Sequence, residues 1–503
     1  MSTIRIYVDN PIATINKNIY GHFAEHLGSC IYEGIWVGED SSIPNTNGFR
    51  NDVVEAMKAI APPVIRWPGG CFADDYHWQD GIGPRESRPS RINIWWGEDV
   101  ETNHFGTHEF IEFCRMVGAD PYIVGNVGSG TANELRNWVE YCNVPGNTTL
   151  SQQRATNGSP EPFGVKYWGV GNENWGCGGR MDPQDYAIEY KRFSTYLRDF
   201  GGSNLFLIAC GPLQGEPKWT RGFFDKLGDY SKIHGFGAHY YARVRDPEGT
   251  PLSEMFTGTA TDYHNDQWYY QMHLGLEMEN LVLQQRAIMD GYDPERKIGL
   301  IWDEWGTWHP PAEGHHPRHL WQQNTMRDAL VAATTLDIFN RHADKVIMSN
   351  IAQTINVLQA MILTDGDKML KTPTYHVYDL YKAHQNATSV ATRFETDDIS
   401  FSMKGKDYTV PTLSGSASIN GDILTISVVN LHADTPIEAN IDIKGAMVKE
   451  ATLQVLAYDD IHAHNTFDDP NEVTPQSSSV TVDDKNWMFT FQPASVSVFK
   501  IRL

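Results

Sequence analysis

KYWGVGNEN at residues 166–174 and KIGLIWDEW at residues 297–305 decide the fold of this 503-residue chain. Each is a short apolar run that ends in polar residues. Six other runs have the same form: IYGHFAEHL (19–27), VIRWPGG (64–70), PYIVGNVG (121–128), LFLIACGP (205–212), HGFGAHYY (234–241) and VIMSNIAQTIN (346–356). The segments between them have helical spacing, as in Tyr190, Phe193 and Leu197. Eight strand–helix units over roughly 370 residues predict a closed (β/α)8 TIM barrel.

An open, doubly wound parallel sheet is the alternative arrangement of such units. It would need a glycine-rich phosphate loop after its first strand, and residues 19–27 contain none. The closed barrel is therefore the better prediction.

The pattern changes near residue 385. Leu424, Ile426 and Val428 alternate with residues of the opposite face, and Asn420-Gly421 is typical of a two-residue hairpin turn. The first strand, which contains Ile4, has no helix after it and is expected to pair with this region. We predict a barrel over 18–385 and a jelly-roll-like antiparallel β-sandwich formed by 1–17 and 386–503.

The composition excludes several classes of partner. With 40 basic and 63 acidic residues the net charge is -23, which disfavours nucleic acid and anionic membrane surfaces.

The N-terminal sequence MSTIRIYVDN lacks a basic-then-apolar leader, so a cytoplasmic location is expected. The six cysteines contain no C-x-x-C pair, so we expect neither a disulfide framework nor a structural zinc site.

Polar residues follow the predicted strands where a barrel core would not need them. Active sites of such barrels lie at the C-terminal ends of the strands. Two of these residues, Glu173 and Glu304, end apolar runs, and a buried unpaired carboxylate costs several kcal/mol. Salt bridges with Arg66 are one explanation. The other residues at strand ends are Glu25, His26, Asn126, Asn172, His239, Tyr241, Gln353 and Asn356.

A pair of carboxylates across a barrel mouth is what glycosidic cleavage requires. One must be protonated to donate to the leaving oxygen, and the other must be ionised to attack the anomeric carbon. Glu173 ends the fourth run and Glu304 the seventh. A separation of about 5–5.5 Å between them would give a covalent intermediate and retention of configuration.

Longer motifs carry a resemblance to one family. Over essentially its whole length the chain resembles the intracellular α-L-arabinofuranosidases of glycoside hydrolase family 51. The motifs are GHFAEHLG (21–28), RWPGGCFADDYHWQDGIGPRESRP (66–89), GVGNENWGCGG (169–179), HYY (239–241), WDEWGTW (302–308) and NIAQTINVLQAMI (350–362).

The resemblance implies a role for each matching residue. Glu173 matches the acid/base and Glu304 the nucleophile; Asn172 is expected to bond the sugar 2-OH. Tyr241 and Arg66 are expected to hold Glu304 in place and ionised. Implied substrate contacts are Glu25, Cys71, Asn172, Tyr241 and Gln353, and implied supporting residues are Arg66, His239 and Trp95. The resemblance also implies arabinofuranosyl oligosaccharide substrates, no cofactor or metal, and a homo-oligomer, specifically a hexamer.

Three features depart from the family pattern or leave alternatives open. Cys71 stands where many relatives have Asn, so it is either a weak sugar contact or a small buried filler. Trp95 and Trp96 are candidates for an aromatic wall. The loop at 309–319 contains four histidines, but it has no metal-binding motif, and we expect it to form a rim over the leaving-group side.

Rival functions remain on the same scaffold. A β-xylosidase or an endo-β-glucanase would differ in the loops that shape the pocket. A non-catalytic sugar-binding barrel would not need the pair of carboxylates. The sequence therefore favours exo-acting hydrolysis of terminal α-L-arabinofuranosyl residues.

Overall fold

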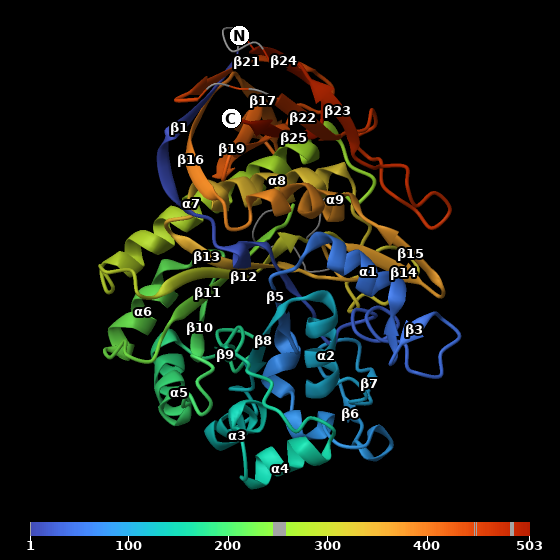
Figure 1. Ribbon diagram of the computed structural model, residues 1–503, viewed down its shortest axis with the longest axis vertical. Coiled ribbons are helices and arrows are strands. Elements are labelled where there is room, and N and C mark those ends of the chain that lie inside the picture. Colours follow the sequence, from blue (N-terminus) through green and yellow to red (C-terminus); the bar gives the residue numbers. More distant parts are fainter. Residues whose placement is uncertain (1, 245–257, 447, 449, 483–486) are drawn as a thin grey trace.

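The computed structural model describes residues 2–244, 258–446, 448, 450–482 and 487–503 (Figure 1). All eight predicted runs are parallel strands that close into one barrel in sequence order, which confirms the predicted fold class. The strands are β2 (Gly21–Phe23), β5 (Val64–Trp67), β8 (Asp120–Gly125), β9 (Tyr167–Val170), β10 (Phe206–Leu213), β11 (Gly235–Ala242), β12 (Gly299–Thr307) and β13 (Val346–Ala352).

Helices follow the strands and cover the outside of the barrel, as the helical spacing predicts. They are α1 (Asn51–Ile60), α2 (Thr107–Val117), α3 (Ala132–Asn143), α4 (Thr149–Thr156), α5 (Pro183–Tyr196), α6 (Pro217–Leu227), α7 (Asn265–Asp290), α8 (Met326–Arg341) and α9 (Pro373–Tyr381). Local chemistry sets their first turns. Pro183 and Pro217 begin α5 and α6, and Thr325 with Asp328 forms a capping box at α8. No helix within the described ranges has the length and apolar character needed to span a membrane.

Beyond the barrel, nine strands form one continuous sheet in the order β23-β22-β25-β20-β19-β16-β1-β21-β24. Every neighbouring pair is antiparallel except β1 with β21. Trp487 of β24 touches Phe499 of β25 at 5.2 Å between ring centroids, although five strands separate β24 from β25 in the sheet order. The sheet therefore folds over its own apolar core. Its strands are β1 (Ser2–Thr14), β16 (Thr388–Glu395), β19 (Leu413–Asn420), β20 (Ile423–Asn430), β21 (Ile437–Lys444), β22 (Glu450–Leu456), β23 (Gln476–Val480), β24 (Trp487–Phe491) and β25 (Ser495–Arg502).

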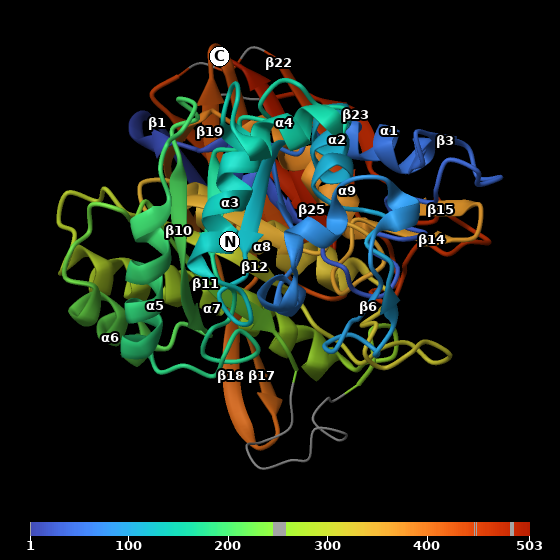
Figure 2. The same cartoon turned by 90° about the horizontal axis from the view of Figure 1, so that it is seen from below.

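The β17–β18 hairpin (Asp398–Met403 and Lys406–Pro411) projects from this sheet, as Figure 2 shows from below. Its Phe401 and Tyr408 contact Tyr269 and Tyr270 of α7, so the hairpin packs against a barrel helix. Three smaller two-stranded sheets are β3–β4 (Asn45–Thr46, Phe49–Arg50), β6–β7 (Arg91–Ile92, Val100–Glu101) and β14–β15 (Ile362–Asp365, Lys368–Lys371).

Helix α8 joins the barrel to the nine-stranded sheet, and residues 326–340 are all buried. Its Asp337 accepts hydrogen bonds from Ser416 and Ser427 of the sheet, and from Tyr381 of α9 at 2.9 Å. Burial raises the pKa of Asp337 to about 6 despite these donors. This contact joins the barrel to the sheet. The division of the chain into a barrel over 18–385 and a sandwich formed by 1–17 and 386–503 stays our proposal.

Replacing Asp337 with Asn should change how stability depends on pH. Asp337 binds its proton more tightly in the folded state, because its folded pKa lies above the ordinary 3.8. The free energy of unfolding of the wild type should therefore fall, relative to Asp337→Asn, as pH rises from about 4 to about 6, by about 3 kcal/mol at most. Urea denaturation at pH 4, 5, 6 and 7 measures this difference. Asp398 is exposed, so Asp398→Asn is the matched control. The assignment is refuted if the free energies of unfolding of the wild type and Asp337→Asn differ by the same amount at every pH.

Candidate active site

The polar strand ends converge on a cavity of about 230 Å³ at the C-terminal mouth of the barrel. Glu25 and Gln353 follow β2 and β13, Glu173 follows β9, and Tyr241 and Glu304 lie in β11 and β12. The structure thus brings the predicted residues together from strands distant in sequence. The lining residues are Glu25, Leu27, Cys71, Trp96, Glu173, Trp175, Leu213, Tyr241, Arg243, Glu304, Trp308, Leu320, Gln353 and Leu358.

Glu304 is held from two sides. The Arg66 guanidinium donates to its Oε2 at 2.8 Å, and the Tyr241 hydroxyl donates to its Oε1 at 2.8 Å. The pKa of Tyr241 lies well above its ordinary value, because burial and the Glu304 carboxylate both raise it, so the phenol stays a donor. Charge-assisted hydrogen bonds of this kind favour the ionised carboxylate and fix its orientation.

Arg66 also organises the neighbours of Glu304. It donates to the backbone oxygen of Asp303 at 3.2 Å and to the side-chain oxygen of Asn172. Burial lowers the pKa of Arg66, but Asp303 and Glu304 raise it well above its ordinary value. Asn172 is buried and is not among the residues that line the cavity, so the structure does not place it for the expected sugar contact.

His239 links the two predicted catalytic carboxylates. Its Nδ1 lies 2.9 Å from Glu173 Oε1 and 3.5 Å from Glu304 Oε2, while its Nε2 lies 3.3 Å from Asp303 Oδ1. Burial alone would lower the pKa of His239, but the three carboxylates raise it to about 10, so the ring is a cation at neutral pH. One oxygen of Glu173 and one of Glu304 lie within 4.8 Å of each other.

Glu25 also lines the cavity. Its Oε1 accepts from Trp96 Nε1 at 2.9 Å and from Phe72 N at 3.2 Å, and its Oε2 accepts from Gln353 Nε2 at 2.9 Å. Burial and the Glu304 carboxylate raise the pKa of Glu25 to about 7. A Cβ at Gly69 would lie 2.5 Å from Glu25 Cγ, so the first glycine of the PGG motif makes room for this side chain.

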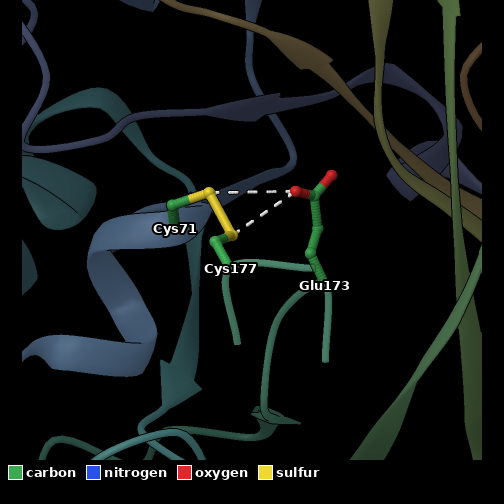
Figure 3. Close-up of side chains that lie close together, drawn as sticks. All are labelled: Cys71, Glu173 and Cys177. Carbon is green, nitrogen blue, oxygen red and sulfur yellow. Dashed lines mark hydrogen bonds between the residues drawn. A yellow bond between two sulfur atoms is a disulfide. The ribbon is translucent and has the colours of Figure 1, made fainter. Parts of the chain in front are cut away.

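The structure corrects the expectation that no disulfide forms. Cys71 and Cys177, which are 106 residues apart, form a disulfide that lies against Glu173 (Figure 3). Cys71 begins a 3-10 helix (Cys71–Asp75) after β5, and Cys177 lies in the turn after β9. Barrel closure brings these loops together, which spacing along the chain cannot reveal. Cys71 lines the cavity as a disulfide sulfur, so it has no thiol proton to donate to a sugar.

Of the two tryptophans predicted to form an aromatic wall, one lines the cavity. Trp96 lines the cavity, whereas Trp95 is not among the lining residues and its backbone oxygen accepts from Arg318.

In the histidine loop at 309–319, His309 is buried against Asp328, and the ring of His315 stacks on Trp321 at 4.1 Å between ring centroids. Within the described ranges, the two groups of atoms close enough to hold a metal ion are Cys71–Glu173–Cys177 and Glu173–His239–Glu304, and neither includes the loop. Cationic Arg66 and His239 disfavour a metal in the second group.

Two buried carboxylates in this region were not predicted from the sequence. Asp74 accepts from the backbone of Val127, Gly128 and Asn172, and so fixes the loop that carries Glu173. Burial raises the pKa of Asp74 to about 7 against these donors. Burial would also raise the pKa of Asp303, but Arg66 and His239 lower it below its ordinary value. Both lie inside the quoted motifs, so their motif positions could have identified them as candidates.

Comparisons with known proteins agree with this geometry. Residues 56–267 match the family of α-L-arabinofuranosidase 1 domains, and residues 303–495 match the α-L-arabinofuranosidase C-terminal domain. An intracellular exo-α-L-arabinofuranosidase of Bacteroides ovatus is 44% identical over 494 residues, which are 98% of this chain and 94% of that protein. The α-L-arabinofuranosidase C of Emericella nidulans is 33% identical, over 87% and 86% of the two chains.

Solved structures are similar over the full length. The GH51 arabinofuranosidase from Xanthomonas axonopodis pv. citri has a TM-score of 0.94 and 41% identity, and the comparison covers 100% of both chains. An arabinose complex of α-L-arabinofuranosidase from Thermotoga maritima has a TM-score of 0.87 and 33% identity, again over 100% of both.

Removal of the Arg66 cation should destabilise the barrel strongly. Arg66→Met leaves Asp303 and Glu304 buried without this partner, and the loss of one member of a buried ion pair costs about 3–5 kcal/mol. Urea denaturation at pH 7 measures the free energy of unfolding. Arg192→Met is the control, because Arg192 pairs with Glu189 on the surface and should cost less than about 1 kcal/mol. Equal losses in the two variants would contradict the role given to Arg66.

Proposed function

Because the chain belongs to the α-L-arabinofuranosidases of glycoside hydrolase family 51, enzymes that remove arabinofuranosyl residues, we propose that it is a retaining exo-glycosidase. It removes terminal, non-reducing α-L-arabinofuranose from arabinoxylan- and arabinan-derived oligosaccharides by double displacement. One observation carries the retaining mechanism: carboxylate oxygens of Glu173 and Glu304 lie within 4.8 Å of each other. Inverting enzymes need about 6.5–9.5 Å between carboxyl groups to admit a water molecule.

Glu304 is the nucleophile and Glu173 the acid/base in this proposal. Arg66 and Tyr241 each donate a hydrogen bond to Glu304, which fixes its orientation for attack on the anomeric carbon. His239 binds Oε1 of Glu173, so Oε2 is the oxygen left to protonate the leaving group. In the second step the same carboxylate takes a proton from water, and this water releases the sugar from Glu304.

The shape and lining of the cavity support an exo-acting enzyme. About 230 Å³ is less than the roughly 300–1,000 Å³ of usual ligand pockets, so the cavity suits a single sugar residue. Glu25 offers acceptors for sugar hydroxyls. Gln353 Oε1 is buried and has no hydrogen-bond partner in the structure, which suits a hydroxyl donor from the substrate. The relative from Bacteroides ovatus is likewise named as exo-acting.

Location and assembly are also proposals. The Bacteroides ovatus relative is named intracellular, and this name supports a cytoplasmic location for the chain. The family resemblance supports a homo-oligomer, specifically a hexamer.

The anomer formed first tests the retaining mechanism. If Glu304 attacks the anomeric carbon, hydrolysis of an aryl α-L-arabinofuranoside must release the α-anomer first, because two inversions restore the configuration. Proton NMR during early turnover detects this product before mutarotation. Initial release of the β-anomer would show that water attacks directly. An absence of hydrolysis, together with cleavage of an aryl β-xyloside or a β-glucan, would assign one of the rival activities.

Substitution of each carboxylate with Ala should separate their roles. A nitrophenolate leaves without protonation, so Glu173→Ala should form the arabinosyl-enzyme on an aryl substrate and then stall. Azide needs no base and should restore turnover, giving the α-arabinosyl azide. On oligosaccharides, whose alkoxide leaves poorly, activity should fall about 10²–10⁴-fold or more.

Glu304→Ala serves as the matched comparison, because it lacks the nucleophile and should be nearly inactive on both substrates. Azide could attack only from the vacated face of the sugar and would give the β-azide. Chromatography and NMR identify the products. The assignment fails if azide rescues Glu304→Ala to the α-product, or if Glu173→Ala keeps full activity on oligosaccharides.

A further inference from the structure

The disulfide lies against the carboxylate oxygen that faces away from His239. Glu173 Oε2 lies 3.5 Å from Cys177 Sγ and 3.8 Å from Cys71 Sγ, as Figure 3 shows. All three residues are partly exposed, and Cys71 and Glu173 line the cavity. A reagent that enters the cavity can therefore reach the disulfide.

The other cysteines are in a different environment. Cys30, Cys114, Cys142 and Cys210 are free and buried, and burial raises the pKa of each thiol. A thiol must lose its proton to bind a metal ion, so these four are poor ligands. Within the described ranges, the pair beside Glu173 is the accessible sulfur site.

Reduction of this pair changes the chemistry of the site. A small dithiol attacks one sulfur, the S–S bond breaks, and after exchange the protein carries two S–H groups while the reagent becomes a disulfide. Exposed disulfides are the more easily reduced ones. The proposed cytoplasmic location is a compartment that keeps thiols reduced, so the dithiol is the form expected there.

We propose that the reduced chain binds a thiophilic divalent cation such as Zn²⁺ through Cys71 Sγ, Cys177 Sγ and Glu173 Oε2, and that the bound cation inhibits the enzyme. Binding displaces the two thiol protons. In tetrahedral zinc coordination a sulfur and an oxygen ligand lie about 3.6 Å apart, and two sulfurs about 3.8 Å apart. The two sulfur–oxygen distances of 3.5 and 3.8 Å already fit, and only the sulfur–sulfur separation must lengthen once the bond is broken.

His239 prepares Glu173 for this ligand set. Its Nδ1 donates to Oε1 of Glu173, which leaves Oε2 directed at the two sulfurs. A hydrogen bond to the other oxygen of a ligating carboxylate fixes its orientation. The fourth coordination position would face the cavity and take a water molecule.

Inhibition follows from which oxygen the cation takes. In the proposed mechanism Oε2 of Glu173 delivers the proton to the leaving group, and a cation bound there removes this proton and fills part of the cavity. This step of the inference rests on the proposed function, and the expected reduced state rests on the proposed location. The disulfide form offers no thiolates and should not bind the cation.

Direct binding can be measured without an assay of activity. Cd²⁺ replaces Zn²⁺ at thiolate sites and gives an ultraviolet charge-transfer band. The full-length enzyme, reduced with a dithiol and freed of reagent under nitrogen, should bind one equivalent of Cd²⁺ with this band. The air-oxidised enzyme should show none. In parallel, free Zn²⁺ at about ten times its dissociation constant should lower the hydrolysis of an aryl arabinofuranoside about tenfold for the reduced enzyme, and less than about twofold for the oxidised enzyme.

Variants locate the site. Cys71→Ser and Cys177→Ser should each weaken Cd²⁺ binding at least about tenfold, because each removes one thiolate. Cys142→Ala, which removes a buried thiol in α3, should keep both the band and the affinity. Thermal unfolding checks that each variant is folded. Absence of the band in the reduced wild type, or full affinity in both serine variants, would overturn the proposal; an oxidised enzyme inactive on the aryl substrate would instead count against the proposed function.

Discussion

The buried guanidinium of Arg66 is the interaction on which the mouth of the barrel depends. It donates to the side chains of Glu304 and Asn172, and to the backbone of Asp303. These partners come from the loop after β9 and from β12, so one cation fixes the positions of two separate segments. A buried arginine is stable only with such partners, and the carboxylates are stable only with the arginine. The loss of Arg66 would therefore leave these carboxylates buried without compensation.

The charges around Arg66 also explain how one pocket can hold several carboxylates. Glu25, Glu173, Asp303 and Glu304 face two cations, Arg66 and the protonated His239. Four ionised carboxylates would leave an excess of negative charge in a buried space. The raised pKa of Glu25, about 7, reduces that excess. Reduction of the disulfide would add two further potential anions, which a divalent cation would neutralise.

The nine-stranded sheet packs on α8 through β16, β19, β20 and β25 (Figure 1). Asp337 of α8 and the serines at 416 and 427 form a buried polar contact between the two units. Such a contact is stable only when every group has a partner, so it specifies one orientation of the sheet. The sheet supplies none of the residues that line the active-site cavity.

The eight strands, their order and the polar residues that end them can be predicted from the sequence, because they depend on periodicity within short segments. The sequence also placed Glu173 and Glu304 as the central pair. Three features required the folded chain: the disulfide between Cys71 and Cys177, the place of Trp96 rather than Trp95 in the cavity lining, and the contacts of His239 with the carboxylates. Those contacts join segments up to about a hundred residues apart. They arise from the closure of the barrel and the paths of its loops, and no local pattern encodes them.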